Sequence, residues 1–128
     1  MVKDLGAVAV EGGKWEIYVG GAAGSSVRKG DVLCVVDSEE DVLKYMGRFV
    51  QYYRENANYL ERTYDFVERY GIEKVRKETV YAPESQKKAL LQRLQKSKTL
   101  SRDAWLERDT PMNSTQFVQI QPMESLVQ

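Results

Sequence analysis

A run of small residues followed by two cations is the part of the sequence best suited to hold an anion. The run is Gly20, Gly21, Ala22, Ala23 and Gly24, and the cations are Arg28 and Lys29. Small side chains let backbone N–H groups approach an anion, and the cations could pair with carboxylates of a cofactor. The run lacks the Gly-Lys-Ser/Thr ending of a Walker loop and does not open a helix as a dinucleotide fingerprint does. Pattern alone favours a flexible connection between strands.

Cysteine and histidine limit the chemistry that this chain can perform alone. Cys34 is the only cysteine, and histidine is absent. These counts exclude an intramolecular disulfide, a thiolate cluster built from this chain, Ser-His-Asp and Cys-His catalysis, and the usual zinc sites. Cys34 lies in an apolar run, which is typical of a small core residue rather than a reactive thiolate. We expect no catalytic residue and no metal ligand in this chain.

Three charged or aromatic groups have alternative interpretations. The acids at 37–41 lack the alternating ligands and central glycine of a calcium loop, so they are better explained as the start of a helix. Aromatic residues at 45–70 have helical spacing, which favours a core or a buried interface over a platform for stacked bases. Residues 87–102 are basic without acids, which could contact nucleic acid or an acidic partner but is typical of a solvated helix face.

Length and charge restrict the class of protein. The 128 residues are 42% hydrophobic, which is enough for one compact domain. Lysine plus arginine and aspartate plus glutamate both number 19, so the formal net charge is zero and gives no general attraction to nucleic acid or anionic lipid. The sequence has no apolar run long enough to span a bilayer and no basic-then-apolar leader. We expect a cytoplasmic protein without membrane contact.

The first third of the sequence predicts β structure. An apolar strand at 6–10 and an alternating strand at 14–19 flank the turn residues 11–13, which indicates an antiparallel hairpin. The alternation places three apolar side chains on one face, namely Trp15, Ile17 and Val19. A third strand at 31–36 is apolar enough to be buried on both faces.

The next part of the sequence predicts helices. Ser38, with Asp41 three residues later, approximates a capping box, and apolar residues then recur at helical spacing as far as Leu60. Thr63 is a candidate cap for a second helix, which Gly71 ends. A third helix is expected at 72–80, and a fourth at 85–100. The predicted fold class is α+β: a small antiparallel β-sheet packed by a long amphipathic helix, with further C-terminal helices and a disordered tail.

Composition divides the sequence into three predicted parts. Residues 1–82 form the α+β domain, and Pro83 begins a basic helical extension, 83–108. An apolar hook is expected at 103–106, within this extension. The aperiodic residues 109–128 are predicted to be disordered.

Several segments closely resemble the large subunit of assimilatory NAD(P)H-dependent nitrite reductases, which belong to the siroheme and 4Fe-4S nitrite and sulfite reductase family. The likeness begins at Lys3-Asp4-Leu5-Gly6 and runs without a break to residue 21. It continues at four further segments: 27–33, 51–55, 59–63 and 68–73. The resemblance spans roughly residues 3–105, and it is specific because the segments are long and in order.

The resemblance implies a C-terminal fragment of a nitrite-reducing enzyme. In that family, electrons pass from NAD(P)H through FAD and a 4Fe-4S cluster to siroheme, where nitrite is reduced to ammonia. The four cluster cysteines lie upstream of the Lys3-Asp4-Leu5-Gly6 stretch, so residues 1–82 would be the end of the siroheme and 4Fe-4S domain. We therefore expect this chain to be inactive by itself. The resemblance does not separate nitrite from sulfite as the substrate.

The resemblance also implies which residues lie near the cofactor and which partners the chain has. The loop at 20–24 would run beside siroheme, where the family often has Gly-Gly-Asn-Gly-Gly. Ala22 stands at the asparagine position and leaves only backbone contacts there. Expected partners are the rest of the large subunit and the small subunit, and a fragment that exposes a former domain interface could also self-associate.

Two other functional classes remain as rivals. One is a stand-alone interaction or scaffold module that reuses the same fold, which a neighbouring reading frame with the cysteine pairs would argue against. The other is a nucleic-acid binder using residues 87–102, whose binding would weaken steeply as salt rises. The neutral net charge makes nucleic acid the least favoured partner.

Overall fold

The structure, a computed structural model, describes residues 1–101. The chain divides into two units, Met1–Ser97 and Lys98–Gln128. The predicted apolar hook at 103–106 and the predicted disordered tail at 109–128 lie outside the described residues. The predicted division of the chain at residues 82 and 108 stays a prediction.

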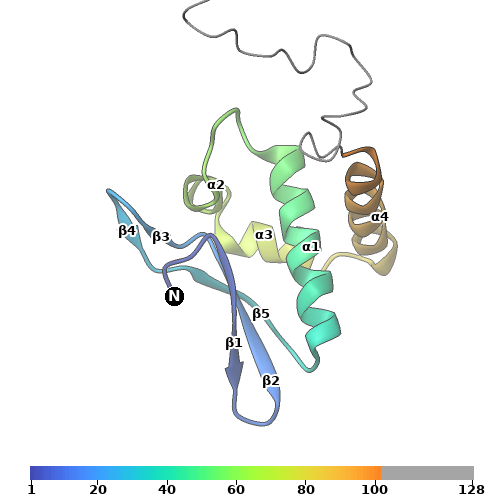
Figure 1. The fold of residues 1–128 in the computed structure, drawn as a ribbon, viewed down its shortest axis with the longest axis horizontal. Coiled ribbons are helices and arrows are strands. Elements are labelled where there is room, and N and C mark those ends of the chain that lie inside the picture. Colours follow the sequence, from blue (N-terminus) through green and yellow to red (C-terminus); the bar gives the residue numbers. More distant parts are fainter. Residues whose placement is uncertain (102–128) are drawn as a thin grey trace, which may run out of the picture. The chain divides into compact units, whose positions relative to one another are not determined.

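A three-stranded antiparallel sheet forms the first layer of the unit Met1–Ser97 (Figure 1). Its strands are β1 (Leu5–Val10), β2 (Lys14–Val19) and β5 (Asp31–Val36), in the order β1-β2-β5. The turn between β1 and β2 contains Gly12 at φ +81° and Gly13 at φ +73°, which are left-handed conformations that glycine adopts without steric cost. The predicted hairpin is confirmed.

The segment predicted as a flexible loop contains a small β-ribbon. β3 (Ala22–Ala23) pairs antiparallel with β4 (Val27–Arg28), and Ala22 lies opposite Arg28. Strands of two residues carry no measurable alternation, so the sequence pattern could not indicate them. The prediction of a flexible connection was therefore wrong for this ribbon.

β5 differs from its prediction because it lies at an edge of the sheet. Leu33 and Val36 are buried at 1% and 7% exposure, but Val35 is 51% exposed. The pairing with β2 shifts register between Ile17 and Tyr18, so β5 carries a bulge at this point. Helices cover only one face of the sheet, which is why an almost continuously apolar strand is not buried on both faces.

The long helix α1 (Glu39–Asn56) begins as predicted and ends earlier. Ser38 is its N-cap, and its Oγ accepts a hydrogen bond from the Asp41 N–H at 3.1 Å. Ala57 is extended, and Leu60, which the periodic pattern placed on the helix, has φ +61° and is 82% exposed. The prediction that the helix continues to Leu60 was wrong.

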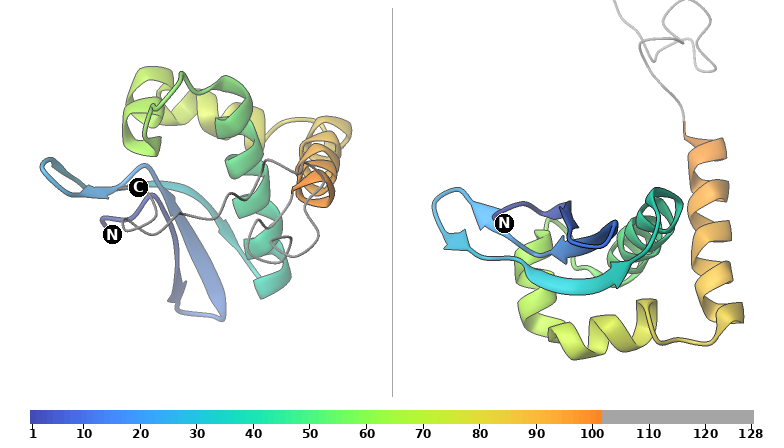
Figure 2. Two further views of the ribbon diagram at one scale, coloured as in Figure 1. Left: turned by 45° about the horizontal axis from the view of Figure 1, so that its top comes forward. Right: turned by 90° about the horizontal axis from the view of Figure 1, so that it is seen from below.

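Three further helices follow among the described residues: α2 (Thr63–Tyr70), α3 (Ile72–Thr79) and α4 (Glu84–Leu100), and α4 lies within the first unit as far as Ser97. Gly71, at φ +83°, separates α2 from α3 as predicted. Thr63 does not cap α2, because Arg62 is the N-cap residue and makes no side-chain cap bond. α4 lies beside α1 (Figure 2). A Cβ on Gly47 would stand 3.1 Å from the side chains of Leu91 and Leu94, so this glycine permits the close approach.

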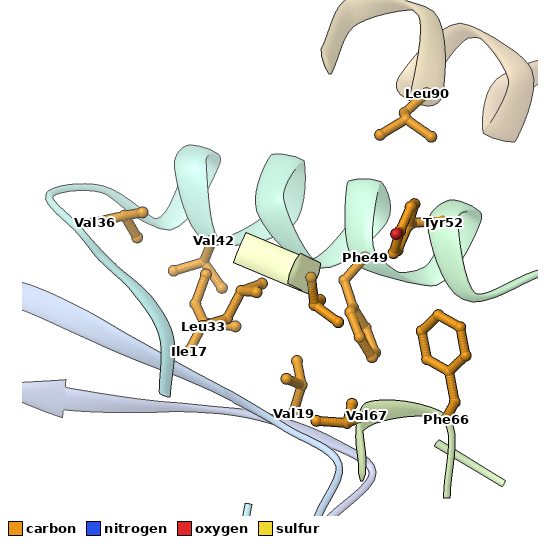
Figure 3. Close-up of a cluster of buried hydrophobic side chains, with 11 residues drawn as sticks. Ile17, Val19, Leu33, Val36, Val42, Phe49, Tyr52, Phe66, Val67 and Leu90 are labelled. Atoms are coloured by element: carbon orange, nitrogen blue, oxygen red, sulfur yellow. The ribbon is translucent and has the colours of Figure 1, made fainter. Parts of the chain in front are cut away.

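One apolar core joins the sheet to the helices. Figure 3 shows Phe49 of α1 pointing toward Val19 of β2 and Val67 of α2. Phe49 and Phe66 are at most 1% exposed, and burial of such a side chain contributes roughly 1.5–3 kcal/mol. The α+β prediction is confirmed, as is the core face Trp15, Ile17 and Val19. Among residues 1–101, no helix is long and apolar enough to cross a membrane.

Candidate anion-binding cleft

A cleft of about 330 Å³ lies between the N-terminal segment, the β3–β4 ribbon and the start of α2. Each of the three segments contributes side chains or backbone to its wall. The lining residues are Val2, Lys3, Asp4, Ala22, Ala23, Gly24, Ser25, Ser26, Arg62 and Tyr64. The structure therefore brings part of the predicted glycine-rich site together with Arg62 and Tyr64, about forty positions later in the chain.

Gly20 and Gly21 lie beneath the cleft rather than along it. The Gly20 N–H donates to the Asp4 carbonyl at 3.0 Å, and the Gly21 N–H donates to the Lys3 carbonyl at 2.9 Å. A Cβ on Gly21 would stand 2.7 Å from the Lys3 backbone, so no larger residue fits there without movement. These two glycines hold the N-terminal segment, and their N–H groups are not available to a ligand.

Ala22, Ala23 and Gly24 are the predicted residues that do line the cleft. Ala22 and Ala23 form β3, and Gly24 begins the turn of the ribbon, where a Cβ would meet nothing within 4 Å. Ala23 and Gly24 are also exposed. Short side chains on an exposed turn leave the backbone open to a bound group.

Arg28 does not line the cleft and holds the structure around it. Its Nη1 donates to the Gly20 carbonyl at 2.7 Å, its Nη2 to Asp31 Oδ2 at 2.8 Å and its Nε to Glu68 Oε1 at 2.9 Å. Two carboxylates thus offset its charge, and the guanidinium connects the ribbon to β5 and α2. Lys29 is exposed and lies outside the cleft lining. That Arg28 and Lys29 pair with cofactor carboxylates stays a prediction.

Seven residues of the cleft lining were not predicted from the sequence: Val2, Lys3, Asp4, Ser25, Ser26, Arg62 and Tyr64. Arg62 Nη2 contacts both carboxylate oxygens of Asp4, at 3.1 and 3.2 Å, and Thr63 Oγ1 donates to Asp4 at 2.5 Å. The hydrogen bond from Thr63, opposed by partial burial and supported by Arg62, lowers the pKa of Asp4 below its usual range. Asp4 therefore remains ionised and offsets part of the positive charge of Arg62. Lys3 is exposed at the rim.

The cleft suits a carboxylate-bearing group, whereas the donors of this chain do not suit an iron–sulfur cluster. A carboxylate accepts hydrogen bonds from cationic side chains and from free backbone N–H groups. The cleft offers both, through Lys3, Arg62 and the exposed backbone of the ribbon. Cys34 packs against the core, and burial, opposed by Arg48 and Arg76, raises its pKa to about 11. It is therefore a protonated thiol at neutral pH, as its apolar surroundings predicted. Within residues 1–101, no group of three or more histidine, cysteine or acidic side chains could hold a metal ion.

A second hollow, of about 260 Å³, lies between α1, α3 and α4 and contains no residue of the predicted site. Glu55 and Arg93 in its wall pair with each other through two contacts. Because this pair satisfies both side chains, we assign the candidate site to the cleft at the β3–β4 ribbon.

Comparison with known proteins covers most of this chain. The sequence profile of the nitrite and sulphite reductase 4Fe-4S domain matches residues 1–88. A "Nitrite reductase [NAD(P)H]" of Bacillus subtilis (strain 168) is 43% identical over 104 residues, which are 81% of this chain and 12% of that protein. An "Assimilatory nitrate reductase electron transfer subunit" of the same organism is 33% identical over 106 residues, which are 83% of this chain and 13% of that protein.

A further relative has sulfite in its name. The "Sulfite reductase, assimilatory-type" of Nitratidesulfovibrio vulgaris is 36% identical over 75 residues, which are 59% of this chain and 34% of that protein. No solved structure matches the chain. The chain thus spans about an eighth of the length of the two Bacillus relatives.

Proposed function

The chain belongs to the nitrite and sulphite reductase 4Fe-4S domain family, and we propose that it is the C-terminal part of the siroheme-binding half of an assimilatory NAD(P)H nitrite reductase large subunit. In this role the cleft at the β3–β4 ribbon takes up carboxylates on the rim of the tetrapyrrole. When bound, siroheme supplies the iron at which nitrite is reduced to ammonia. The residues of this chain bind and orient the macrocycle.

The observation that carries the proposal is the meeting of Lys3, the ribbon residues Ala22–Ala23 and Arg62 in one cleft. A tetrapyrrole with many carboxylates needs close backbone approach on one side and cations on the other. The small residues of the ribbon allow the close backbone approach, and Lys3 and Arg62 are the cations. Arg28 supports this arrangement from behind, since it holds Gly20 at the base of the ribbon.

The proposal divides the work between this chain and its partners. A cluster held by four thiolates requires ligands that this chain, with its single cysteine, does not carry. The cluster, FAD and NAD(P)H would therefore be held by the rest of the large subunit, with the small subunit as a further partner. In this role the chain reduces nitrite only as part of that assembly, and it acts in the cytoplasm.

Titration with uroporphyrin, a tetrapyrrole with carboxylates around its rim, tests the cleft. We expect quenching of porphyrin or tyrosine fluorescence by binding that weakens as salt rises. Lys3→Gln should weaken this binding several-fold, whereas Lys14→Gln, which changes an exposed lysine on β2 outside the cleft lining, should not. If Lys29→Gln weakens binding and Lys3→Gln does not, the cleft is not the site.

A separate assay tests the division of work. The chain is mixed with siroheme and reduced methyl viologen, and ammonia or sulfide is measured after addition of nitrite or sulfite. We expect no product from either substrate. Sustained turnover would contradict the proposal that catalysis requires the rest of the enzyme.

A further inference from the structure

Two cationic side chains are buried together near the start of α4. Arg48 of α1 and Lys87 of α4 are each 8% exposed. Both cations lie over the ring of Tyr45, with Arg48 Cζ 4.7 Å and Lys87 Nζ 5.8 Å from its centroid. Like charges at this spacing repel each other, and burial strengthens the repulsion because less water screens it. Such a pair calls for negative charge close by.

The described residues supply one carboxylate to this pair of cations. Glu84 lies 2.7 Å from Lys87 Nζ, but the Glu84 side chain is 84% exposed. No carboxylate of residues 1–101 forms an ion pair with Arg48, and its Nε is buried there without a hydrogen-bond partner. This chain's own atoms enclose the Nε, so its lack of a partner does not depend on any further part of a longer protein. Two buried cations thus share one exposed acid.

The first turn of α4 adds to the positive potential at this point. The N–H groups of Gln86 and Lys87 donate to the Pro83 carbonyl at 3.0 and 3.1 Å. The N–H groups before them, of Glu84 and Ser85, have no acceptor within the helix, and proline has no side-chain oxygen that could accept from them. They form the positive end of the helix dipole, which attracts anions.

The pKa values of Glu84 and Lys87 show that the charges from both helices act on one another. The hydrogen bond from Lys87 lowers the pKa of Glu84, and the charges of Arg48 and Lys88 lower it further. The same hydrogen bond raises the pKa of Lys87, and the charge of Arg48 opposes this rise. Cations of α1 and α4 therefore converge on the exposed carboxylate of Glu84.

We propose that a phosphate group binds between Arg48, Lys87 and the first turn of α4, where the Glu84 carboxylate now lies. Guanidinium, ammonium and the N–H groups of a helix N-terminus are the donors with which proteins commonly hold phosphate. Because the Glu84 side chain is exposed, it turns into solvent when the phosphate enters. This phosphate site shares no residue with the lining of the cleft at the β3–β4 ribbon.

Charge favours a phosphate over a singly charged ion. A carboxylate or a chloride ion brings one negative charge, the same as the Glu84 side chain that it displaces. A phosphate group carries about −1.5 to −2 at pH 7, which approaches the combined positive charge of Arg48 and Lys87. Its oxygens also accept from both side chains and from the helix N–H groups at once. Inorganic phosphate and a phosphate ester of a small molecule share this chemistry.

Calorimetric titration of the 128-residue chain with inorganic phosphate and with glycerol phosphate tests the inference, at an ionic strength held constant with sodium chloride. We expect millimolar or tighter binding that exceeds any effect of chloride. Binding of both compounds would support a site for the bare phosphate group. Binding of the ester alone would support a site in which the organic part contributes. Binding of neither compound would overturn the inference.

Arg48→Met should weaken phosphate binding about tenfold, because it removes a charged donor from the site. The variant should stay folded, since methionine leaves no buried donor without a partner. Lys96→Gln is the matched control, because it removes an exposed cation from a later turn of α4 and should leave binding unchanged. Equal losses in the two variants would show general attraction to basic residues and would overturn the inference.

Glu84→Gln should change binding in the opposite direction. It removes the carboxylate that competes for Lys87 and Arg48, so phosphate should bind several-fold more tightly. Glu11→Gln makes the same change of charge at an exposed turn between β1 and β2, and it should leave phosphate binding unchanged. Weaker binding in Glu84→Gln, or an equal gain in Glu11→Gln, would contradict a phosphate site at the start of α4.

Discussion

The guanidinium of Arg69 binds both carboxylate oxygens of Glu61, with Nε 2.8 Å from Oε2 and Nη2 2.7 Å from Oε1. The Asn58 N–H donates to the same carboxylate at 3.0 Å, and the Tyr53 hydroxyl donates to the Glu61 carbonyl. Arg69 also lies over the ring of Tyr70, 4.7 Å from its centroid. These contacts hold the connection between α1 and α2 in one conformation.

The Glu61–Arg69 pair should make stability depend on pH in an acidic window. The hydrogen bonds from Arg69, then from the Asn58 N–H, lower the pKa of Glu61 from 4.5 to about 2. A carboxyl with a lowered folded-state pKa adds stability above its unfolded value, and this is lost as pH falls through the folded value. The melting temperature should fall between pH 4.5 and about 2, measured by circular dichroism.

Glu61→Gln should reduce this acid-dependent loss. Glu73→Gln is the matched control, because Glu73 is 81% exposed and pairs with Arg76 on its own helix. Equal acid slopes for Glu61→Gln and the unchanged protein would contradict the assignment.

The protein should be more stable with glycine at position 60 than with alanine at this position. The φ of Leu60, +61°, is a left-handed conformation that costs a residue with a Cβ about 1–2 kcal/mol, and the side chain is 82% exposed, so little packing is lost. We expect Leu60→Gly to exceed Leu60→Ala by about 1 kcal/mol in unfolding free energy, after the entropy of glycine is offset. Urea denaturation measures this difference. The reverse order would mean that the left-handed conformation is not strained.

Arg28 should contribute to folding even without a cofactor. Arg28→Met leaves the Gly20 carbonyl, Asp31 and Glu68 without their donor. Charged hydrogen bonds contribute about 1.5–3 kcal/mol when shielded, and partial exposure of these groups reduces that. We expect a loss of about 2 kcal/mol by urea denaturation, against less than about 0.5 kcal/mol for Lys29→Met. Equal losses of stability in Arg28→Met and Lys29→Met would contradict the inference that Arg28 stabilises the fold through these three contacts.

Arg48 should be replaceable by methionine with a gain in stability. Arg48 is 8% exposed, and its Nε is buried without a hydrogen-bond partner in the described part of the chain. A buried unsatisfied donor costs about 1–3 kcal/mol. The contact of Arg48 with the Tyr45 ring contributes about 2 kcal/mol when it is desolvated, and methionine replaces part of it with a sulfur–aromatic contact. Arg48→Met should therefore raise the unfolding free energy by about 1 kcal/mol, and Lys44→Met on the same helix should change it little. A loss in Arg48→Met would indicate that a counter-charge reaches Arg48.

Elements that depend on neighbouring residues in the chain could be predicted from the sequence. The Gly12-Gly13 turn, the Ser38 cap and the break at Gly71 are local, and each is where the pattern placed it. Beyond the end of α1, Glu61 binds Arg69, and this contact between distant residues is not part of any helical period. The β3–β4 ribbon is too short for a period of its own.

The candidate site could be predicted only in part. The small residues Ala22, Ala23 and Gly24 were indicated by composition, and the resemblance placed them beside a cofactor. Arg28 was predicted from its charge, but its carboxylate partners lie in β5 and α2. Arg62 is held at the cleft by its hydrogen bond to Asp4, which is 58 positions earlier in the chain. A periodic pattern does not extend over such a distance.

The bond from Thr63 to Asp4, across 59 positions, also bears on when the cleft can form. During synthesis the N-terminal segment and the ribbon leave the ribosome well before α2. The wall supplied by Arg62 and Tyr64 can be added only after α2 has emerged and docked. A tetrapyrrole that needs the complete cleft would therefore be inserted after translation of this region, not during it.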